Sequence, residues 1–216
     1  MIITWYGQSC VKLQTANATV LIDPYDSKIG LRLPKVTADF VLVTHDHYDH
    51  NNVAAVTGTP YVASAPGEYE VRGVFARGIP AFHDATEGKE RGVITMFRIE
   101  AEGMTLVHLG DLGQPKLTDE QFEGLNGADI LFVPVGGTYT IDAKAAVDII
   151  TQLEPRIVIP IHYKIPGLDA KLNLDGVEKF VKQMGVTTNG SEDKLKIVKK
   201  DLPQDETKVI ILKPDV

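Results

Sequence analysis

Three histidines and two aspartates fall within six residues, in the segment His45-Asp46-His47-Tyr48-Asp49-His50. The segment directly follows the apolar run 40–43. Imidazoles and carboxylates are common ligands of transition-metal ions, and this density of them exceeds what a folded core needs. An apolar strand that ends in such a cluster is how a rigid sheet presents a metal site, and the H-x-H-x-D-H spacing favours two adjacent ions over one. The segment therefore predicts a metal-dependent hydrolase.

Histidine or aspartate also stands at or just beyond the C-terminal end of four other apolar runs, at Asp23, His83, Asp111 and His162. Loops at strand ends are where a rigid scaffold displays functional groups. One histidine in such a place is more often a core residue with a satisfied hydrogen bond, but five such placements together are hard to explain that way.

The elements that would position these residues change character along the chain. Short β-rich runs are predicted at 2–6, 10–14 and 19–22, a loop at 26–37, a buried strand at 39–43, a short helix at 51–56, strands and turns over 61–99, and a strand at 104–109. Three helices are predicted next: 117–125, with Thr118 and Gln121 as a capping box, 143–153, capped by Asp142, and 177–184, ended by Gly185. They alternate with or precede strands predicted at 130–133, 156–161, 195–198 and 208–212. No linker divides the chain, so the order predicts one layered α/β domain over residues 1–216.

Composition is that of a globular protein, with 44% hydrophobic and 24% charged residues among 216. The net charge of −7 argues against a broad nucleic-acid surface, although bound cations could still attract phosphate substrates. The one cysteine, Cys10, rules out an intrachain disulfide and is predicted to be a small buried residue. Neither a basic, apolar leader nor an apolar run of about 18 residues is present, so we expect a cytoplasmic protein without a membrane span.

Taken together, these residues resemble the metallo-β-lactamase fold superfamily, and within it the Zn-dependent hydrolase branch that includes ascorbate-6-phosphate lactonase-like proteins. The resemblance rests on Asp23, the segment 44–50, His83, Gly110-Asp111 and the segment 161–163, in the superfamily's order. It implies a four-layer αββα sandwich with the site at one edge of the facing sheets.

The resemblance also implies a ligand set: His45, His47 and His83 at metal site 1, and Asp49, His50 and His162 at metal site 2, with Asp111 bridging both. Two divalent ions are expected, Zn²⁺ first, with Mn²⁺ or Fe²⁺ as alternatives. A metal-bridging hydroxide, with Asp49 and Asp111 as the catalytic carboxylates, would attack a carbonyl or phosphoryl ester of a small anionic substrate. Asp23 would orient a ligand histidine and would not bind an ion.

Other residues carry two interpretations each. Thr138, Tyr139 and Thr140 follow two glycines and are candidate substrate contacts, although the stretch could be only a strand-to-helix turn. Lys164 could face an anionic substrate or solvent, and Asp46 could orient a ligand or bond to nearby backbone. His108 is predicted to be a core histidine, and Tyr48 could line the pocket or only pack.

One position departs from the resembling proteins, which often begin with a strand and Gly-His-Ser. This chain has Gly7-Gln8-Ser9, and glutamine is a far poorer zinc ligand than histidine. The departure puts any role of this position in ligation or proton transfer in doubt.

Two alternative functions remain at this stage. A nuclease would share the metal core but usually adds an RNA-clamping domain, for which the chain has no room. A metal-binding scaffold or interaction protein that kept the fold and lost turnover is disfavoured because no ligand is missing. Flavo-diiron chemistry is disfavoured because His47 is not glutamate, and β-lactamase activity because no secretory leader is seen. A small-molecule substrate is therefore the expected partner, and a homo-oligomer is left open.

Overall fold

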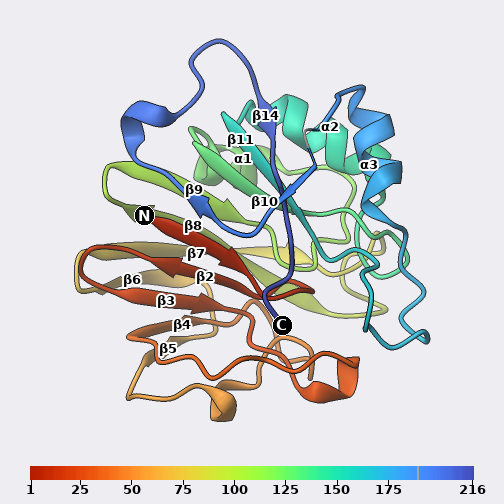
Figure 1. Cartoon of the computed structure of the whole chain (residues 1–216). Coiled ribbons are helices and arrows are strands. Elements are labelled where there is room, and N and C mark those ends of the chain that lie inside the picture. Colours follow the sequence, from red (N-terminus) through yellow and green to blue (C-terminus); the bar gives the residue numbers. More distant parts are fainter. Residues whose placement is uncertain (189) are drawn as a thin grey trace.

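The computed structural model describes residues 1–188 and 190–216, and two large β-sheets dominate it (Figure 1). The first sheet has the strand order β13-β1-β2-β3-β4-β5. Its strands are β1 (Ile2–Trp5), β2 (Val11–Gln14), β3 (Thr19–Ile22), β4 (Phe40–Leu42), β5 (Tyr61–Ala63) and β13 (Leu195–Lys196). Neighbours are antiparallel from β13 to β3 and parallel from β3 to β5.

The second sheet has the order β14-β11-β10-β9-β8-β7-β6. Its strands are β6 (Gly67–Val71), β7 (Val74–Phe82), β8 (Val93–Ala101), β9 (Met104–His108), β10 (Ile130–Pro134), β11 (Ile157–Ile161) and β14 (Lys208–Val209). The β6–β9 part is antiparallel, whereas β9, β10, β11 and β14 run parallel. A small parallel pair joins β12 (Ser191–Glu192) to β15 (Ile211–Leu212).

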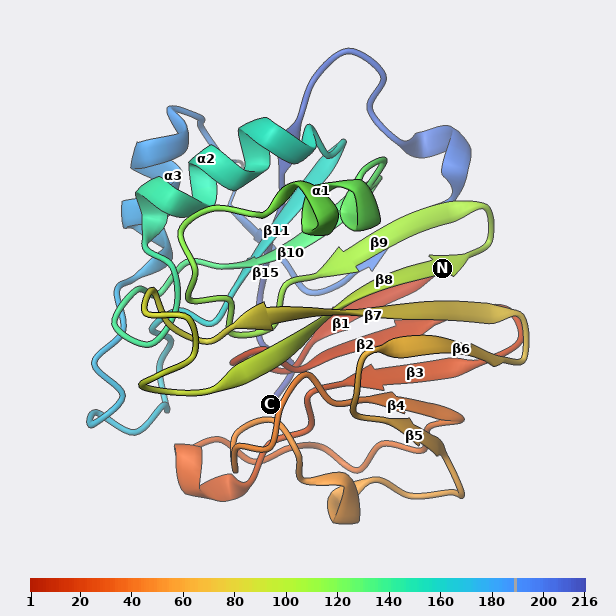
Figure 2. The same cartoon turned by 180° about the vertical axis from the view of Figure 1, so that it is seen from behind.

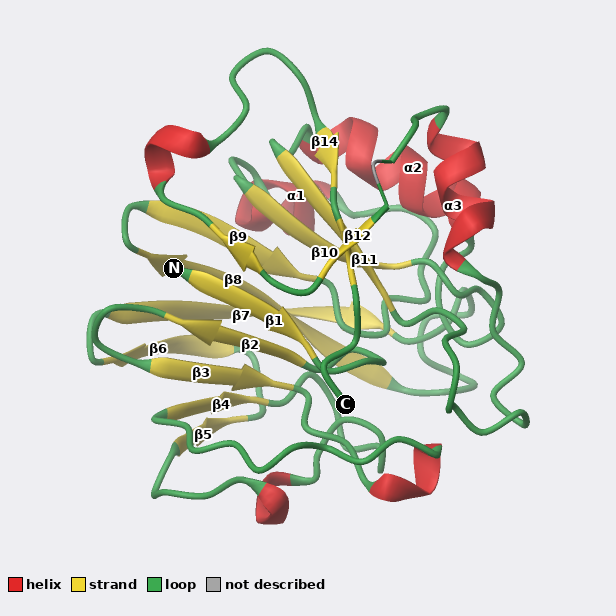
Figure 3. Ribbon diagram, in the orientation of Figure 1, coloured by secondary structure: helices red, strands yellow, loops and turns green. Residues whose placement is uncertain are grey.

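The helices α1 (Asp119–Leu125), α2 (Ala143–Leu153) and α3 (Val177–Met184) all lie on the side of the seven-stranded sheet (Figures 1 and 2). The 3₁₀ turns η1 (Ser27–Ile29) and η2 (Val53–Ala55) lie beyond β5, at the opposite end of the views, and η3 (Lys199–Asp201) precedes β14 (Figure 3). The arrangement confirms an α/β sandwich of the metallo-β-lactamase type, although short turns and loops cover the outer side of the first sheet in the described residues. No helix within residues 1–188 or 190–216 is long and apolar enough to cross a membrane.

Burial explains why the predicted elements form. All five residues of β10 and of β11 are buried, as expected for parallel strands covered on both faces. Trp5, Phe40 and Phe97 are among the largest fully buried side chains, so apolar residues of both sheets form one core. The capping box of Thr118 and Gln121 and the Asp142 cap are present as predicted.

Three sequence predictions differ from the structure. The predicted strand 208–212 divides into β14 and β15, which pair with β11 and β12 respectively. The predicted helix at 51–56 is only the three-residue turn η2, and the predicted strand 195–198 ends at Lys196. Pairing partners far along the chain decide these bounds, and a local pattern does not reveal them.

The direction of the strands places the loops that carry candidate ligands at one edge of each sheet. In the first sheet β1 and β3 run the same way, and β4 is parallel to β3. In the second sheet β7, β9 and β11 share one direction. The segments that follow β1, β3 and β4 therefore leave one sheet at one edge, and those that follow β7, β9 and β11 leave the other sheet at one edge.

Candidate metal centre

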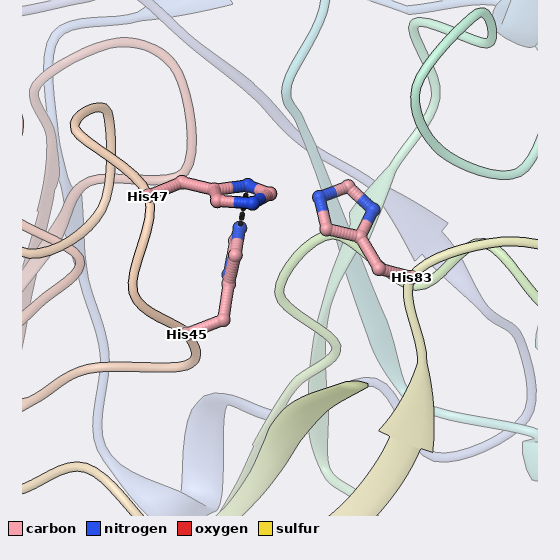
Figure 4. A group of neighbouring side chains, drawn as sticks. All are labelled: His45, His47 and His83. Carbon is pink, nitrogen blue, oxygen red and sulfur yellow. Dashed lines mark hydrogen bonds between the residues drawn. The ribbon is translucent and has the colours of Figure 1, made fainter. Parts of the chain in front are cut away.

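Seven candidate ligand side chains, all buried except the exposed His47, meet where these loops converge, in two groups. The histidine group consists of His45, His47 and His83 (Figure 4). The mixed group consists of Asp49, His50, Asp111 and His162. Within each group, one ligand atom from every residue lies within 4.8 Å of the others. The structure thus brings together all seven side chains that the sequence analysis assigned to the two metal sites, in the same two sets, with Asp111 placed in the mixed group.

Asp111, which follows β9, lies between the two groups. Its Oδ2 atom is 3.1 Å from His162 Nε2, 3.2 Å from His50 Nε2 and 3.7 Å from His83 Nε2. Its other oxygen, Oδ1, accepts a hydrogen bond of 3.1 Å from the Ser9 hydroxyl. One carboxylate oxygen is therefore within reach of ligands from both groups, which is the position that a bridging ligand requires.

Asp23 lies behind the ligands and controls two of them. It is fully buried, with Oδ1 accepting from the Thr44 N–H at 2.8 Å and Oδ2 accepting from the Thr44 hydroxyl at 2.8 Å. Oδ2 also lies 2.9 Å from His50 Nδ1, so this nitrogen must carry a proton and donate it. His50 then presents Nε2 to Asp49 and Asp111, at 3.5 and 3.2 Å.

The same aspartate acts on His45 through Thr44. Because the Thr44 hydroxyl donates its one proton to Asp23, it can only accept from His45 Nδ1, which is 3.0 Å away. His45 therefore has a bare Nε2, the atom that lies 2.9 Å from His47 Nδ1 in Figure 4. Asp23 thus sets the tautomer of one histidine in each group, as outer partners of metal ligands do.

Two glycines permit the close approach of the ligand loops. A Cβ at Gly113 would lie 2.2 Å from the His83 carbonyl oxygen, and a Cβ at Gly136 would lie 2.2 Å from the His162 carbonyl oxygen. Any side chain at either position would push a candidate ligand out of place. These glycines follow β9 and β10, so they connect the ligand loops of the second sheet.

The pKa values of the candidate ligand histidines are shifted in opposite directions. Burial and the neighbouring His50 lower the pKa of His45 to about 2, so its imidazole is neutral at physiological pH and can offer a lone pair. Burial opposes protonation of His50, but Asp111, Asp23 and Asp49 outweigh it and raise its pKa well above the ordinary value. Burial likewise opposes ionisation of Asp111, but His162 and His50 hold its pKa well below the ordinary value. A cation entering the mixed group would therefore displace a proton from His50.

The residues fit metal ions in a further respect. His50 Nε2, which faces Asp111 Oδ2 at 3.2 Å, is buried and has no hydrogen-bond partner of good geometry among the described residues. Buried polar atoms are rarely left in this state unless an ion or water completes them. The donor set of imidazoles and carboxylates suits zinc, manganese or iron.

Gln8 is the residue that the sequence analysis left in doubt, and it contacts the mixed group. It is fully buried, and its Nε2 donates to Asp49 Oδ2 at 2.9 Å and lies 2.8 Å from His162 Nε2. Its Oε1 is a further buried atom, with no hydrogen-bond partner in the described part of the chain. Its φ of 49° places it in the left-handed region, which few non-glycine residues occupy. The position after β1 therefore remains part of the centre although histidine is absent.

A cavity of about 370 Å³ opens onto the centre. Its floor is formed by candidate ligands, and its rim by Tyr48, Glu90, Arg91, Tyr139 and Leu172. Tyr139 is thus the one predicted substrate contact that lines it. Neither Glu90 nor Arg91 was predicted, because nothing in the local sequence indicates where the loop after β7 folds.

The other residues predicted to contact substrate do not line the cavity. The Thr138 hydroxyl donates to the Asn173 carbonyl, and the Thr140 hydroxyl donates to the Ile141 carbonyl. Lys164 is exposed and is not among the cavity residues. The turn interpretation therefore describes Thr138 and Thr140 better than substrate contact does.

His108 is the core histidine that the sequence predicts, whereas Asp46 neither orients a ligand nor bonds to neighbouring backbone among the described residues. His108 is fully buried, with Nε2 donating to the Ser9 carbonyl and Nδ1 accepting from the Gly110 N–H, so both nitrogens are used. Asp46 is exposed and accepts a hydrogen bond from the Asn51 side chain. Neither lies in either ligand group.

The fold and the two ligand groups define a protein of the β-lactamase superfamily, and comparison with known proteins agrees. Residues 2–162 match the family described as Beta-lactamase superfamily domain, to which the chain belongs. It belongs more narrowly to the UPF0173 family. It is 32% identical over 191 residues to a UPF0173 protein of Pyrococcus abyssi, covering 77% of this chain and 85% of that protein.

One more sequence relative and one solved structure are similar to this chain. A UPF0173 metal-dependent hydrolase of Geobacillus is 32% identical over 197 residues, covering 76% of this chain and 85% of the relative. The crystal structure of a candidate Zn-dependent hydrolase of the metallo-β-lactamase superfamily from Thermotoga maritima superposes with a TM-score of 0.78 and 35% identity, covering 98% of this chain and 99% of that one. The predicted superfamily and branch are confirmed.

Proposed function

We propose that this chain is a dinuclear metal-dependent hydrolase that cleaves a carbonyl or phosphoryl ester of a small substrate. The observation that carries the proposal is the position of Asp111, whose Oδ2 lies within 3.7 Å of ring nitrogens from both ligand groups. A buried carboxylate between two imidazole clusters suits a pair of cations. The metal-dependent hydrolases among its relatives support the same reaction class.

The residues take distinct roles in this proposal. His45, His47 and His83 would hold one ion, Asp49, His50 and His162 would hold the other, and Asp111 would serve both. When bound, such cations supply Lewis-acid polarisation of the substrate and lower the pKa of water. Zinc is the first candidate because five imidazoles contribute to the set, with manganese and iron as alternatives.

The chain's own groups would handle orientation and protons. Asp23 keeps His45 and His50 in the tautomers that offer Nε2 to an ion. Asp49 and Asp111 are the carboxylates on the cavity floor and can accept a proton as the ester is cleaved. The cavity of about 370 Å³ admits a ligand of modest size.

The test combines metal analysis with turnover. Two equivalents of metal per chain and metal-dependent hydrolysis of a lactone panel or of bis-p-nitrophenyl phosphate are expected. Asp111→Asn should lose both the second equivalent and the turnover. The proposal fails if the metal-loaded protein cleaves no carbonyl or phosphoryl ester, or if one equivalent saturates it.

A further inference from the structure

The rim of the cavity carries a single basic residue. Among the residues that line the cavity, Arg91 is the only lysine or arginine, and it stands opposite Tyr139. Its guanidinium carbon lies 5.6 Å from the centroid of the Tyr139 ring. The two residues come from the loop after β7 and the segment after β10, so only the fold brings them together.

The backbone under Arg91 is held in place by one buried carboxylate. Asp84, directly after His83, accepts hydrogen bonds from the N–H groups of Thr86, Gly88, Glu90 and Arg91, at 2.8, 2.9, 3.0 and 2.8 Å. The His83 N–H donates to the Gly92 carbonyl at 3.0 Å and closes the loop. A candidate metal ligand and Arg91 are therefore at the two ends of one braced loop, which fixes where the Arg91 side chain leaves the backbone.

The guanidinium has donors to spare. Within the described chain it donates no hydrogen bond, and its one ion-pair contact is to Glu90, at 3.8 Å from a carboxylate that is 60% exposed. Such surface pairs are weak. The side chain of Arg91 is itself 33% exposed, so a ligand in the cavity can reach it. Arginine binds carboxylate and phosphate oxygens through two parallel N–H bonds, and stacking on an aromatic ring pre-orients it for that geometry.

The charge of the site points the same way. Divalent cations held by the two ligand groups would offset the carboxylates of Asp49 and Asp111 on the floor, and Glu90 is the one acidic side chain among the rim residues, so the cavity would not repel an anion. We infer that Arg91, at cation–π distance from Tyr139, is the binding site for an anionic group of the substrate, a carboxylate or phosphate at the end away from the scissile bond. This inference rests on the proposed function and deepens it: the substrate is a small ester or lactone that carries a remote anionic group.

A pair of esters that differ only in that group tests the inference. The zinc-loaded protein would be assayed with mono-p-nitrophenyl glutarate and with neutral p-nitrophenyl valerate, and kcat/KM compared. Three variants would be used: Arg91→Met, Arg91→Lys, and Lys89→Met as the matched control. Lys89 lies in the same loop and, among the residues that the structure describes, its ammonium pairs with the exposed Glu87 alone. We expect Arg91→Met to lower the ratio of kcat/KM, charged over neutral ester, by about tenfold or more. Arg91→Lys should lower it less, and Lys89→Met should leave it unchanged.

Calorimetric titration of the zinc-loaded proteins with glutarate and with glycerol phosphate separates the two anions and does not depend on turnover. Weaker binding of either anion to Arg91→Met, but not to Lys89→Met, supports the inference even if neither ester is cleaved, a result that would count against the proposed function alone. An unchanged kcat/KM ratio in Arg91→Met, or equal anion binding by wild type and Arg91→Met, overturns the inference and leaves the hydrolase proposal standing. Absence of anion binding to the wild type overturns it as well.

Discussion

Replacing Asp23 by asparagine should weaken metal binding although Asp23 is not itself a ligand. The substitution preserves shape but turns one acceptor oxygen into an NH₂ donor. If the NH₂ takes the place of Oδ2, it faces the N–H of His50, now 2.9 Å away. His50 must then move its proton to Nε2, the atom that faces Asp49 and Asp111, and that nitrogen can no longer bind an ion.

The size of the effect follows from the bond that is lost. A hydrogen bond to a charged group contributes about 1.5–3 kcal/mol, which corresponds to about 10- to 100-fold in zinc affinity at 1.4 kcal/mol per tenfold. The opposite amide orientation places the NH₂ against the buried Thr44 N–H, and an unpaired buried donor costs about 1–3 kcal/mol of folding stability. At about 2–4 °C per kcal/mol, the melting temperature would fall by about 2 to 12 °C.

The assay is titration of the metal-free protein with zinc in competition with a chelating dye, alongside thermal melting. Asp26→Asn is the matched control, since Asp26 is nearby, caps the Lys28 N–H and does not touch the ligand groups. Asparagine caps equally well there. Zinc affinity of Asp23→Asn within twofold of wild type, with an unchanged melting temperature, would refute the tautomer argument.

Three further predictions concern the same centre and its surroundings. Gln8→His places an imidazole beside Asp49 and His162, at a φ of 49° that histidine tolerates, and should tighten zinc binding in the dye assay; weaker binding would show that the position does not reach the ions. Removing metal with a chelator should lower the melting temperature and zinc should restore it, by roughly 8–16 °C when free zinc is about 1,000 times Kd; an unchanged melting temperature would contradict a folded-state metal site. Burial raises the pKa of the Cys10 thiol, so at pH 8 the native protein should not react with a thiol reagent, whereas the urea-unfolded chain should react with one equivalent; rapid labelling of the native form would contradict the buried position.

Residues close together in the sequence revealed most of the centre. The segment 45–50 supplies four of the seven candidate ligands from one loop. Their spacing in the sequence was therefore enough to predict a metal site. The strands before Asp23, His83, Asp111 and His162 were also visible, because buried parallel strands are continuous apolar runs. The helix 143–153 was predicted to the residue, since its cap and its apolar face are local signals.

The tertiary structure decided which residues from distant segments contact one another or line the cavity. Predicted contacts Thr138 and Thr140 bond to nearby carbonyls, whereas Arg91, which no pattern singled out, faces the cavity. Strand pairing divided the run 208–212 between two sheets for the same reason: its partners are β11 and β12.

The sequence by itself therefore determined which chemistry this protein can hold, because ligand types and their spacing within one loop are local properties. Only the tertiary structure decided which residues orient the candidate ligands and which line the cavity beside them. Asp23 reaches His45 through Thr44 and His50 directly, across more than twenty residues of chain, and Arg91 meets Tyr139 only because β7 and β10 end at the same edge. Such contacts depend on strand direction and register, and these are properties of the whole sheet.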